Sequence, residues 1–128
     1  MPELAFRDGV MDRIRLREPR YDEQAYLFVL SALEYTQSKI DARRHISAAE
    51  LASSFRELAL ERFGLMSRMV FEHWGVSSTS DIGEIVFTLV DLGFLVKQPN
   101  DTREEFAGLY DFETAFERDY PWNIAHQA

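Results

Sequence analysis

Three histidines, His45, His73 and His126, are the side chains of this sequence best suited to acid–base chemistry or metal binding. Imidazole titrates near neutral pH and is a common metal ligand. No two of them have the spacing of a zinc-binding helix, and the chain has no cysteine to complete a site. His73 falls at the expected end of a helix, where a cation complements the helix dipole. The sequence therefore predicts no metal and no cofactor.

Basic and aromatic side chains are better candidates for a binding surface. Arg43, Arg44 and His45 follow one another in a predicted loop. They could hold an acidic peptide or a phosphate, or they could simply form a solvated loop that nearby carboxylates partly neutralise. Tyr110 and Trp122 belong to an acidic, aromatic C-terminal stretch whose rings could form a patch for a partner. These five residues form the candidate interaction surface.

The same aromatic stretch could instead close the core. Phe106, Phe112 and Phe116 are spaced so that a segment folding back over the helices would insert its rings between them. We expect these three phenylalanines to be buried. Trp122 follows a proline near the C-terminus, and the sequence leaves its role open.

The charge of the chain is unevenly distributed. Residues 1–76 carry 11 basic and 12 acidic side chains, a net −1, whereas residues 77–128 carry 3 and 10, a net −7. A strongly acidic half repels phosphate backbones and anionic membranes. It suits a basic protein partner, or it is a solvated surface without a partner.

Composition narrows the class of protein further. A chain of 128 residues with 46% hydrophobic residues can bury one core, so we expect a single domain over residues 1–128. No apolar run approaches the roughly 18 residues that span a bilayer, and the charged N-terminus lacks the apolar core of a signal peptide. The absence of cysteine is compatible with a reducing compartment. A cytoplasmic location without membrane contact is the simplest expectation.

Hydrophobic periodicity predicts a mainly helical fold. Residues 1–20 should form a short N-terminal helix and a connection, and residues 21–93 the helical core. Within the core, Asp22 is a plausible cap for a helix to about residue 37. Ser47 and Glu50 form an S-x-x-E capping box that should begin the next helix. Further helices are expected at about residues 65–74 and 80–92.

Three glycines each precede an apolar residue where a helix should end: Gly64-Leu65, Gly75-Val76 and Gly93-Phe94. In such endings the apolar residue packs back on the helix five positions upstream. After the last of them, residues 94–96 are apolar, residues 99–101 supply turn chemistry, and residues 106–112 could return as a second strand. We therefore expect a β-hairpin over residues 94–112 followed by a tail over residues 113–128. This order of elements predicts a single winged-helix-like domain, mainly α with a small C-terminal β-hairpin.

Winged helices often bind DNA, but the residue types in this sequence argue against DNA binding. The helix at 80–92 would be the recognition helix, yet it contains no arginine or lysine, the residues that most often read base edges. Asp81, Glu84 and Asp91 lie there instead. We expect both faces of this helix to be buried, with Ile85 and Leu89 inaccessible to solvent.

Four stretches carry a resemblance to a known family: RYDEQAYLFVLSALEYTQ, RRHISAAEL, HWGVSSTSDIGEIVFTLVDLGFLVK and YDFETAF. Over about residues 4–120 the chain resembles a family of short uncharacterised bacterial proteins found mainly in planctomycetes and verrucomicrobia. The resemblance implies a standalone domain. It implies no activity, cofactor or catalytic residue.

The sequence thus favours a non-enzymatic protein-interaction or adaptor module, with another protein as its partner and an oligomeric state that the sequence does not specify. A DNA-binding transcriptional regulator is the alternative. A small hydrolytic or metal-dependent enzyme that uses His45 or His73 is the least favoured hypothesis.

Overall fold

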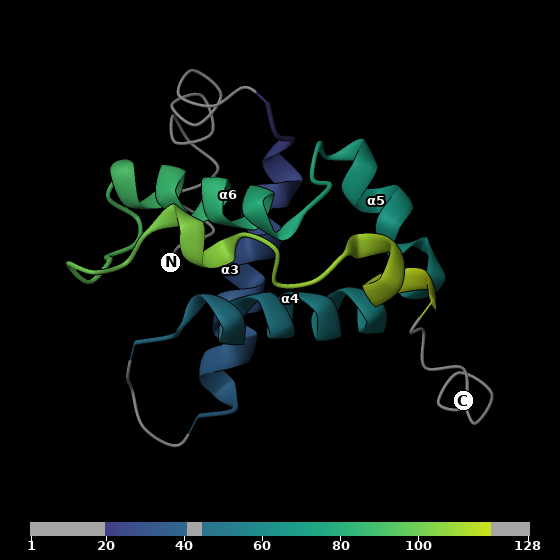
Figure 1. Cartoon of the computed structure of the whole chain (residues 1–128), viewed down its shortest axis with the longest axis horizontal. Coiled ribbons are helices and arrows are strands. Elements are labelled where there is room, and N and C mark those ends of the chain that lie inside the picture. Colours follow the sequence, from purple (N-terminus) through teal and green to yellow (C-terminus); the bar gives the residue numbers. More distant parts are fainter. Residues whose placement is uncertain (1–19, 41–44, 119–128) are drawn as a thin grey trace.

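Four α-helices and three short helical turns make up the part of the chain that the computed structural model describes, residues 20–40 and 45–118 (Figure 1). The α-helices are α3 (Glu23–Ser38), α4 (Ala48–Phe63), α5 (Ser67–His73) and α6 (Thr79–Asp91). The short turns are the 3-10 turns η2 (Gly64–Met66) and η3 (Arg103–Phe106) and the π-helical turn η4 (Thr114–Arg118). In Figure 1, α4 crosses the lower part of the view, α6 and α5 lie above it, and the segment from η3 to η4 passes between these layers. The helix expected within residues 1–20 lies almost wholly outside the described residues.

The helices α3 and α4 begin where the sequence predicts. The Asp22 carboxylate accepts a hydrogen bond from the backbone N–H of Gln24 at 2.9 Å. At the start of α4 the Ser47 hydroxyl accepts from the Glu50 N–H at 3.1 Å, and the Glu50 carboxylate accepts from the Ser47 N–H at 2.9 Å. These bonds satisfy backbone donors that the first helical turn leaves without partners. The predicted capping box is confirmed.

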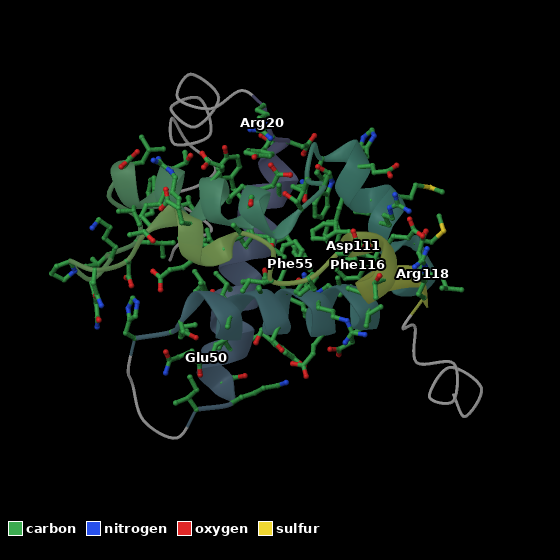
Figure 2. All side chains as sticks on the ribbon, in the orientation of Figure 1. Arg20, Glu50, Phe55, Asp111, Phe116 and Arg118 are labelled. Carbon is green, nitrogen blue, oxygen red and sulfur yellow. The ribbon has the colours of Figure 1, made fainter. Side chains whose placement is uncertain are left out.

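Aromatic rings fill the space between α3, α4 and α5. The ring centroids of Phe55 and Phe71 lie 4.8 Å apart, those of Phe28 and Phe55 5.0 Å apart, and those of Phe71 and Phe116 5.3 Å apart. Figure 2 labels Phe55 on α4 and Phe116 on η4 in this central region. The three phenylalanines predicted to close the core are all buried, which confirms that prediction: Phe106, Phe112 and Phe116.

Two of the three glycine helix ends have the predicted geometry. Gly93 has a φ of 87°, and the Phe94 N–H then reaches back to the Leu89 carbonyl at 2.9 Å. The Val76 N–H bonds to the Phe71 carbonyl in the same way, at 2.8 Å. The Gly64 ending differs, because the chain continues directly into η2 instead of folding back. Leu65 is 42% exposed there, whereas Val76 at the end of α5 is buried.

The predicted hairpin over residues 94–112 does not form, and the winged-helix-like fold class is therefore wrong. Among the described residues there is no strand. The N–H groups of Phe94 and Leu95 both bond to the Leu89 carbonyl, at 2.9 and 3.3 Å, so these residues finish α6 and do not start a strand. Val96 follows them with 92% of its surface exposed. The return segment begins as η3, because Thr102 and Glu105 form a capping box that starts a helical turn.

Packing between α6 and η3 replaces the hairpin. Gly83 in the middle of α6 leaves room for the Phe106 ring, and a Cβ atom at this position would lie 2.9 Å from the Cβ, Cγ and Cδ2 atoms of Phe106. The other side of α6 faces the helical core, and Ile85 and Leu89 are completely buried. The predicted burial of Ile85 and Leu89 is confirmed. Val86 and Val90 are half-buried, so α6 is a central element of the core with one partly accessible edge.

Candidate binding pocket at the ends of α3 and α6

A pocket of about 410 Å³ opens where the C-terminal halves of α3 and α6 meet the start of α4. We call it the α3–α6 pocket. Its volume falls in the range of cavities that hold a small molecule or a large side chain of a partner. Aliphatic and aromatic side chains form most of its wall: Leu33, Ile46, Ala48, Leu51, Val86, Phe87, Val90, Leu95, Val96 and Phe106. The remaining lining is polar: Gln37, His45, Ser47, Lys97, Asp101, Thr102 and Glu105.

Three local signals in the sequence bring these walls together. The capping box at Ser47 fixes the start of α4 beside α3. Gly93 ends α6 and turns the chain so that Leu95 and Val96 come back over the pocket. The capping box at Thr102 then starts η3, which Phe106 fastens to α6. The pocket is thus a consequence of how three helix termini are arranged.

Several of the apolar side chains in the wall remain partly accessible to solvent. Leu33, Val86 and Leu95 are half-buried and pack on the edge of the core, and Val90 is half-buried as well. Leu51 and Phe106 are buried in the core. Val96 extends into solvent at the rim. An apolar group that entered the pocket would remove these partly exposed surfaces from water, which is favourable by about 25 cal/mol per Å².

His45 and Asp101 connect two sides of the pocket. The His45 Nε2 lies 2.9 Å from the Asp101 Oδ2, and the pair joins the residues before α4 to the turn at residues 98–101. The same Asp101 oxygen accepts the Gln98 N–H at 2.8 Å, which tightens that turn. Of the predicted candidates in the described part of the chain, His45 is the residue that lines the pocket.

A histidine–carboxylate pair can orient a general base, and such a base acts on a hydroxyl nucleophile within hydrogen-bond reach. The two hydroxyls in the lining belong to Ser47 and Thr102. The Ser47 hydroxyl accepts the Glu50 N–H at 3.1 Å at the start of α4, and Thr102 begins η3, where its backbone N–H donates to the Glu105 carboxylate at 2.9 Å. Both residues begin helices, and the pocket around them presents a largely apolar surface with a polar margin.

A second polar cluster lies at the opposite end of α6, around Asp81. This carboxylate is only 3% exposed and accepts from the Tyr21 hydroxyl at 2.6 Å and from the Ser77 N–H at 2.8 Å. The Arg20 guanidinium donates to the Asp81 Oδ1 at 2.8 Å. The cluster joins the residues before α3 to the start of α6, and Figure 2 places Arg20 at that upper end of the molecule. Its hydrogen bonds hold the fold together at a point remote from the pocket.

Burial and hydrogen bonding shift the pKa values in this cluster in opposite directions. Burial alone would raise the pKa of Asp81, but the hydrogen bonds from Tyr21 and Ser77 and the charge of Arg20 outweigh it, so this pKa is lowered. The pKa of Tyr21 is raised, first by burial and then by its hydrogen bond to the Asp81 carboxylate. Asp81 is therefore ionised and Tyr21 neutral throughout the physiological range.

Tyr110, the other candidate of the predicted interaction surface that the structure describes, lies away from the pocket. The Tyr110 hydroxyl donates to the Ala52 carbonyl on α4 at 2.7 Å, and its ring stacks on Phe112 with centroids 5.9 Å apart. Burial raises the pKa of Tyr110. Arg43, Arg44 and Trp122 lie outside the described residues.

Sequence reasoning missed most of the pocket wall, although signals for two parts of it are present. The T-x-x-E pattern at Thr102 is a capping box, and it indicates a helical start within the predicted hairpin. Gly83 interrupts an otherwise apolar helix, which is typical of a close approach by another segment. The same reasoning missed the S-x-x-D capping box of Ser78 and Asp81.

No group of three or more histidine and acidic side chains in the described residues is arranged to hold a metal ion. Within the same part of the chain, none of the helices has the length and apolar character that crossing a bilayer requires. Comparisons of the chain with models of known protein families, with curated protein sequences and with solved structures found no match.

Proposed function

We propose that this chain is a non-enzymatic protein-interaction module that receives apolar side chains of a partner in the α3–α6 pocket. The observation that carries the proposal is the pocket itself, about 410 Å³ in volume with a largely apolar wall. Protein interfaces are commonly anchored by a few apolar or aromatic side chains that enter such pockets, surrounded by a polar rim. His45, Lys97, Asp101 and Glu105 supply a rim of this kind.

The position of the pocket supports an interaction role. Its wall comes from helix ends and from the connection between α6 and η3, while the large aromatic core lies between the helices and does not depend on the pocket being filled. A partner could therefore bind without opening the core. Rigid helices on several sides also keep the pocket formed before binding, which reduces the entropic cost of association.

Selection from random peptides tests the proposal even though the natural partner is unidentified. Twelve-residue peptides displayed on phage are selected on the wild-type protein and then tested on Val90→Glu, which places a charge in the half-buried wall. The matched control is Met69→Glu, at a 61% exposed methionine on α5 that does not line the pocket. We expect enriched peptides that share an apolar anchor, bind the control as they bind wild type, and lose at least about tenfold in affinity for Val90→Glu.

Methyl NMR spectra locate the binding site in the same experiment. Peptide binding should shift the methyl resonances of Leu33, Val86 and Leu95, and amide spectra of both variants establish that they remain folded. Peptides that bind Val90→Glu as tightly as wild type would contradict the proposal, as would failure to enrich any peptide.

A further inference from the structure

The lining of the α3–α6 pocket holds two carboxylates, one lysine and one histidine, and exposed carboxylates of neighbouring residues add to its negative charge. Asp101 and Glu105 belong to the lining. Glu34 on α3 lies one helical turn before the lining residue Gln37, on the same side of the helix, and Glu104 precedes Glu105 in η3. Acidic side chains therefore stand on two different walls, one formed by α3 and the other by η3.

Two of these carboxylates are available to a partner. Glu34 and Glu104 are exposed, and neither has an ion-pair partner among the residues that the structure describes. The other two serve the fold, because Asp101 pairs with His45 and Glu105 accepts the Thr102 N–H at 2.9 Å.

Two cations oppose this arrangement. Arg103 precedes Glu104 on η3, and its guanidinium lies 5.3 Å from the ring centroid of the lining residue Phe87. It pairs there with Glu84 and Asp91 at 3.5 and 3.9 Å. Lys97 also lines the pocket, and its ammonium group contacts the Gln98 carbonyl at 3.4 Å. A single exposed lysine on a turn can swing into solvent, since its side chain has a flexible four-carbon stem and a strongly hydrated charge. Two carboxylates of α6 match Arg103, so the helical walls keep an excess of negative charge.

The segments that surround the pocket are also negatively charged on balance. Residues 77–128 contribute 3 basic and 10 acidic side chains, a net −7, and this segment supplies α6, the turn after it and η3. Salt screens these charges beyond a Debye length of about 8 Å at physiological ionic strength. They therefore act mainly on the rate at which a partner is encountered, whereas the carboxylates beside the pocket act on the bound partner.

We infer that the partner presents an apolar anchor flanked by lysine or arginine residues. The anchor would enter the α3–α6 pocket and its basic neighbours would meet Glu34 and Glu104. This inference rests on the proposed function, and it adds the chemistry of the partner to it.

Three synthetic nonapeptides test the charge preference. They share the central sequence Ser-Leu-Trp-Ser-Leu and differ only in two flanking residues at each end, which are lysine, glutamate or serine. Binding to the full chain is measured by fluorescence anisotropy across a salt series. We expect the lysine peptide to bind at least about tenfold tighter than the glutamate peptide at low salt. The difference should shrink toward about twofold at high salt, because ions screen the rim.

A pair of matched variants separates the rim from the overall charge. Glu34→Gln combined with Glu104→Gln removes two rim carboxylates, and Glu57→Gln combined with Glu61→Gln removes two exposed carboxylates from the opposite half of α4. Both change the net charge equally. We expect the rim variant to lose about three- to tenfold in affinity for the lysine peptide and to leave the serine peptide unaffected, with the control close to wild type.

Each alternative result has a definite meaning. If the peptides bind equally, if the glutamate peptide binds best, or if the control variant weakens binding as much as the rim variant, the charge preference is refuted while the pocket function stands. If the lysine, serine and glutamate peptides all leave the methyl groups of Val86 and Val90 unperturbed, and phage selection also yields no ligand for the pocket, the proposed function fails as well.

Discussion

Single residues stabilise this fold where a polar group is buried with a complete set of partners. Asp81 is the clearest case, since both of its carboxylate oxygens accept hydrogen bonds and its charge faces Arg20. Burying a charge is costly unless such partners replace water. Because they do, Asp81 ties the residues before α3 to the start of α6 and does not need a catalytic role to explain its position.

Replacing Asp81 with asparagine should lower the free energy of unfolding by about 2–3 kcal/mol at neutral pH, because hydrogen bonds to a buried charge are lost or weakened. The native pKa of Asp81 lies below its unfolded value of about 3.9, so its contribution is present above that value and disappears as the pH falls through the native pKa. In urea denaturation at several pH values, the free energy of unfolding should therefore decrease less at acidic pH for Asp81→Asn than for wild type.

Glu57→Gln is the matched control for that experiment. Glu57 pairs with Lys39 at 2.7 Å, but both side chains are nearly half exposed, and such surface pairs contribute little to stability. Equal effects of the two substitutions, or an unchanged acid dependence in Asp81→Asn, would contradict the role assigned to Asp81.

At the scale of elements, close packing of η3 against α6 determines the path of the chain after the last helix. Phe106 fills the space that Gly83 leaves on α6, and this contact takes the place of strand pairing. The apolar residues at 94–96 do not need a partner strand, since Phe94 and Leu95 complete the end of α6. The same contact forms one wall of the α3–α6 pocket.

Gly83→Ala should destabilise the protein by about 1–3 kcal/mol, because the added methyl group would overlap the Phe106 ring. Alanine is the better helix former by about 1 kcal/mol, so helix propensity alone predicts the opposite sign. A double-mutant cycle with Phe106→Ala, measured by urea denaturation, isolates the contact. In the Phe106→Ala background the substitution at Gly83 should become neutral or stabilising, and an unchanged penalty would show that the contact is not its cause.

For the whole molecule, charge and burial together argue against the alternative function of DNA binding. The chain carries a formal net charge of −8, and α6, which a winged helix would use to read DNA, is a core helix without arginine or lysine. Non-specific affinity for DNA depends on cations that neutralise phosphates. The carboxylates around the pocket instead suit the basic protein partner proposed above.

Electrophoretic mobility-shift measurements with duplex DNA at about 50 mM salt should show no complex at micromolar protein, because phosphate contacts are strongest at low salt and still require cations. The lysine-flanked peptide serves as a positive control for a folded, binding-competent preparation. A shift that weakens steeply with salt would restore the regulator hypothesis.

The sequence by itself determined the main helices and several of their ends. Capping at Asp22 and Ser47 and the stop at Gly93 depend on neighbours within one or two helical turns, so local spacing was enough to predict them. The apolar spacing of α6 likewise predicted that Ile85 and Leu89 face the core. The path of residues 94–112 depends instead on a contact between Gly83 and Phe106, which are 23 positions apart in the sequence. A short apolar run does not by itself distinguish a strand from the end of a helix. Only the tertiary structure brought His45 to Asp101 and assembled the α3–α6 pocket, because its wall combines segments whose proximity depends on how the helices pack.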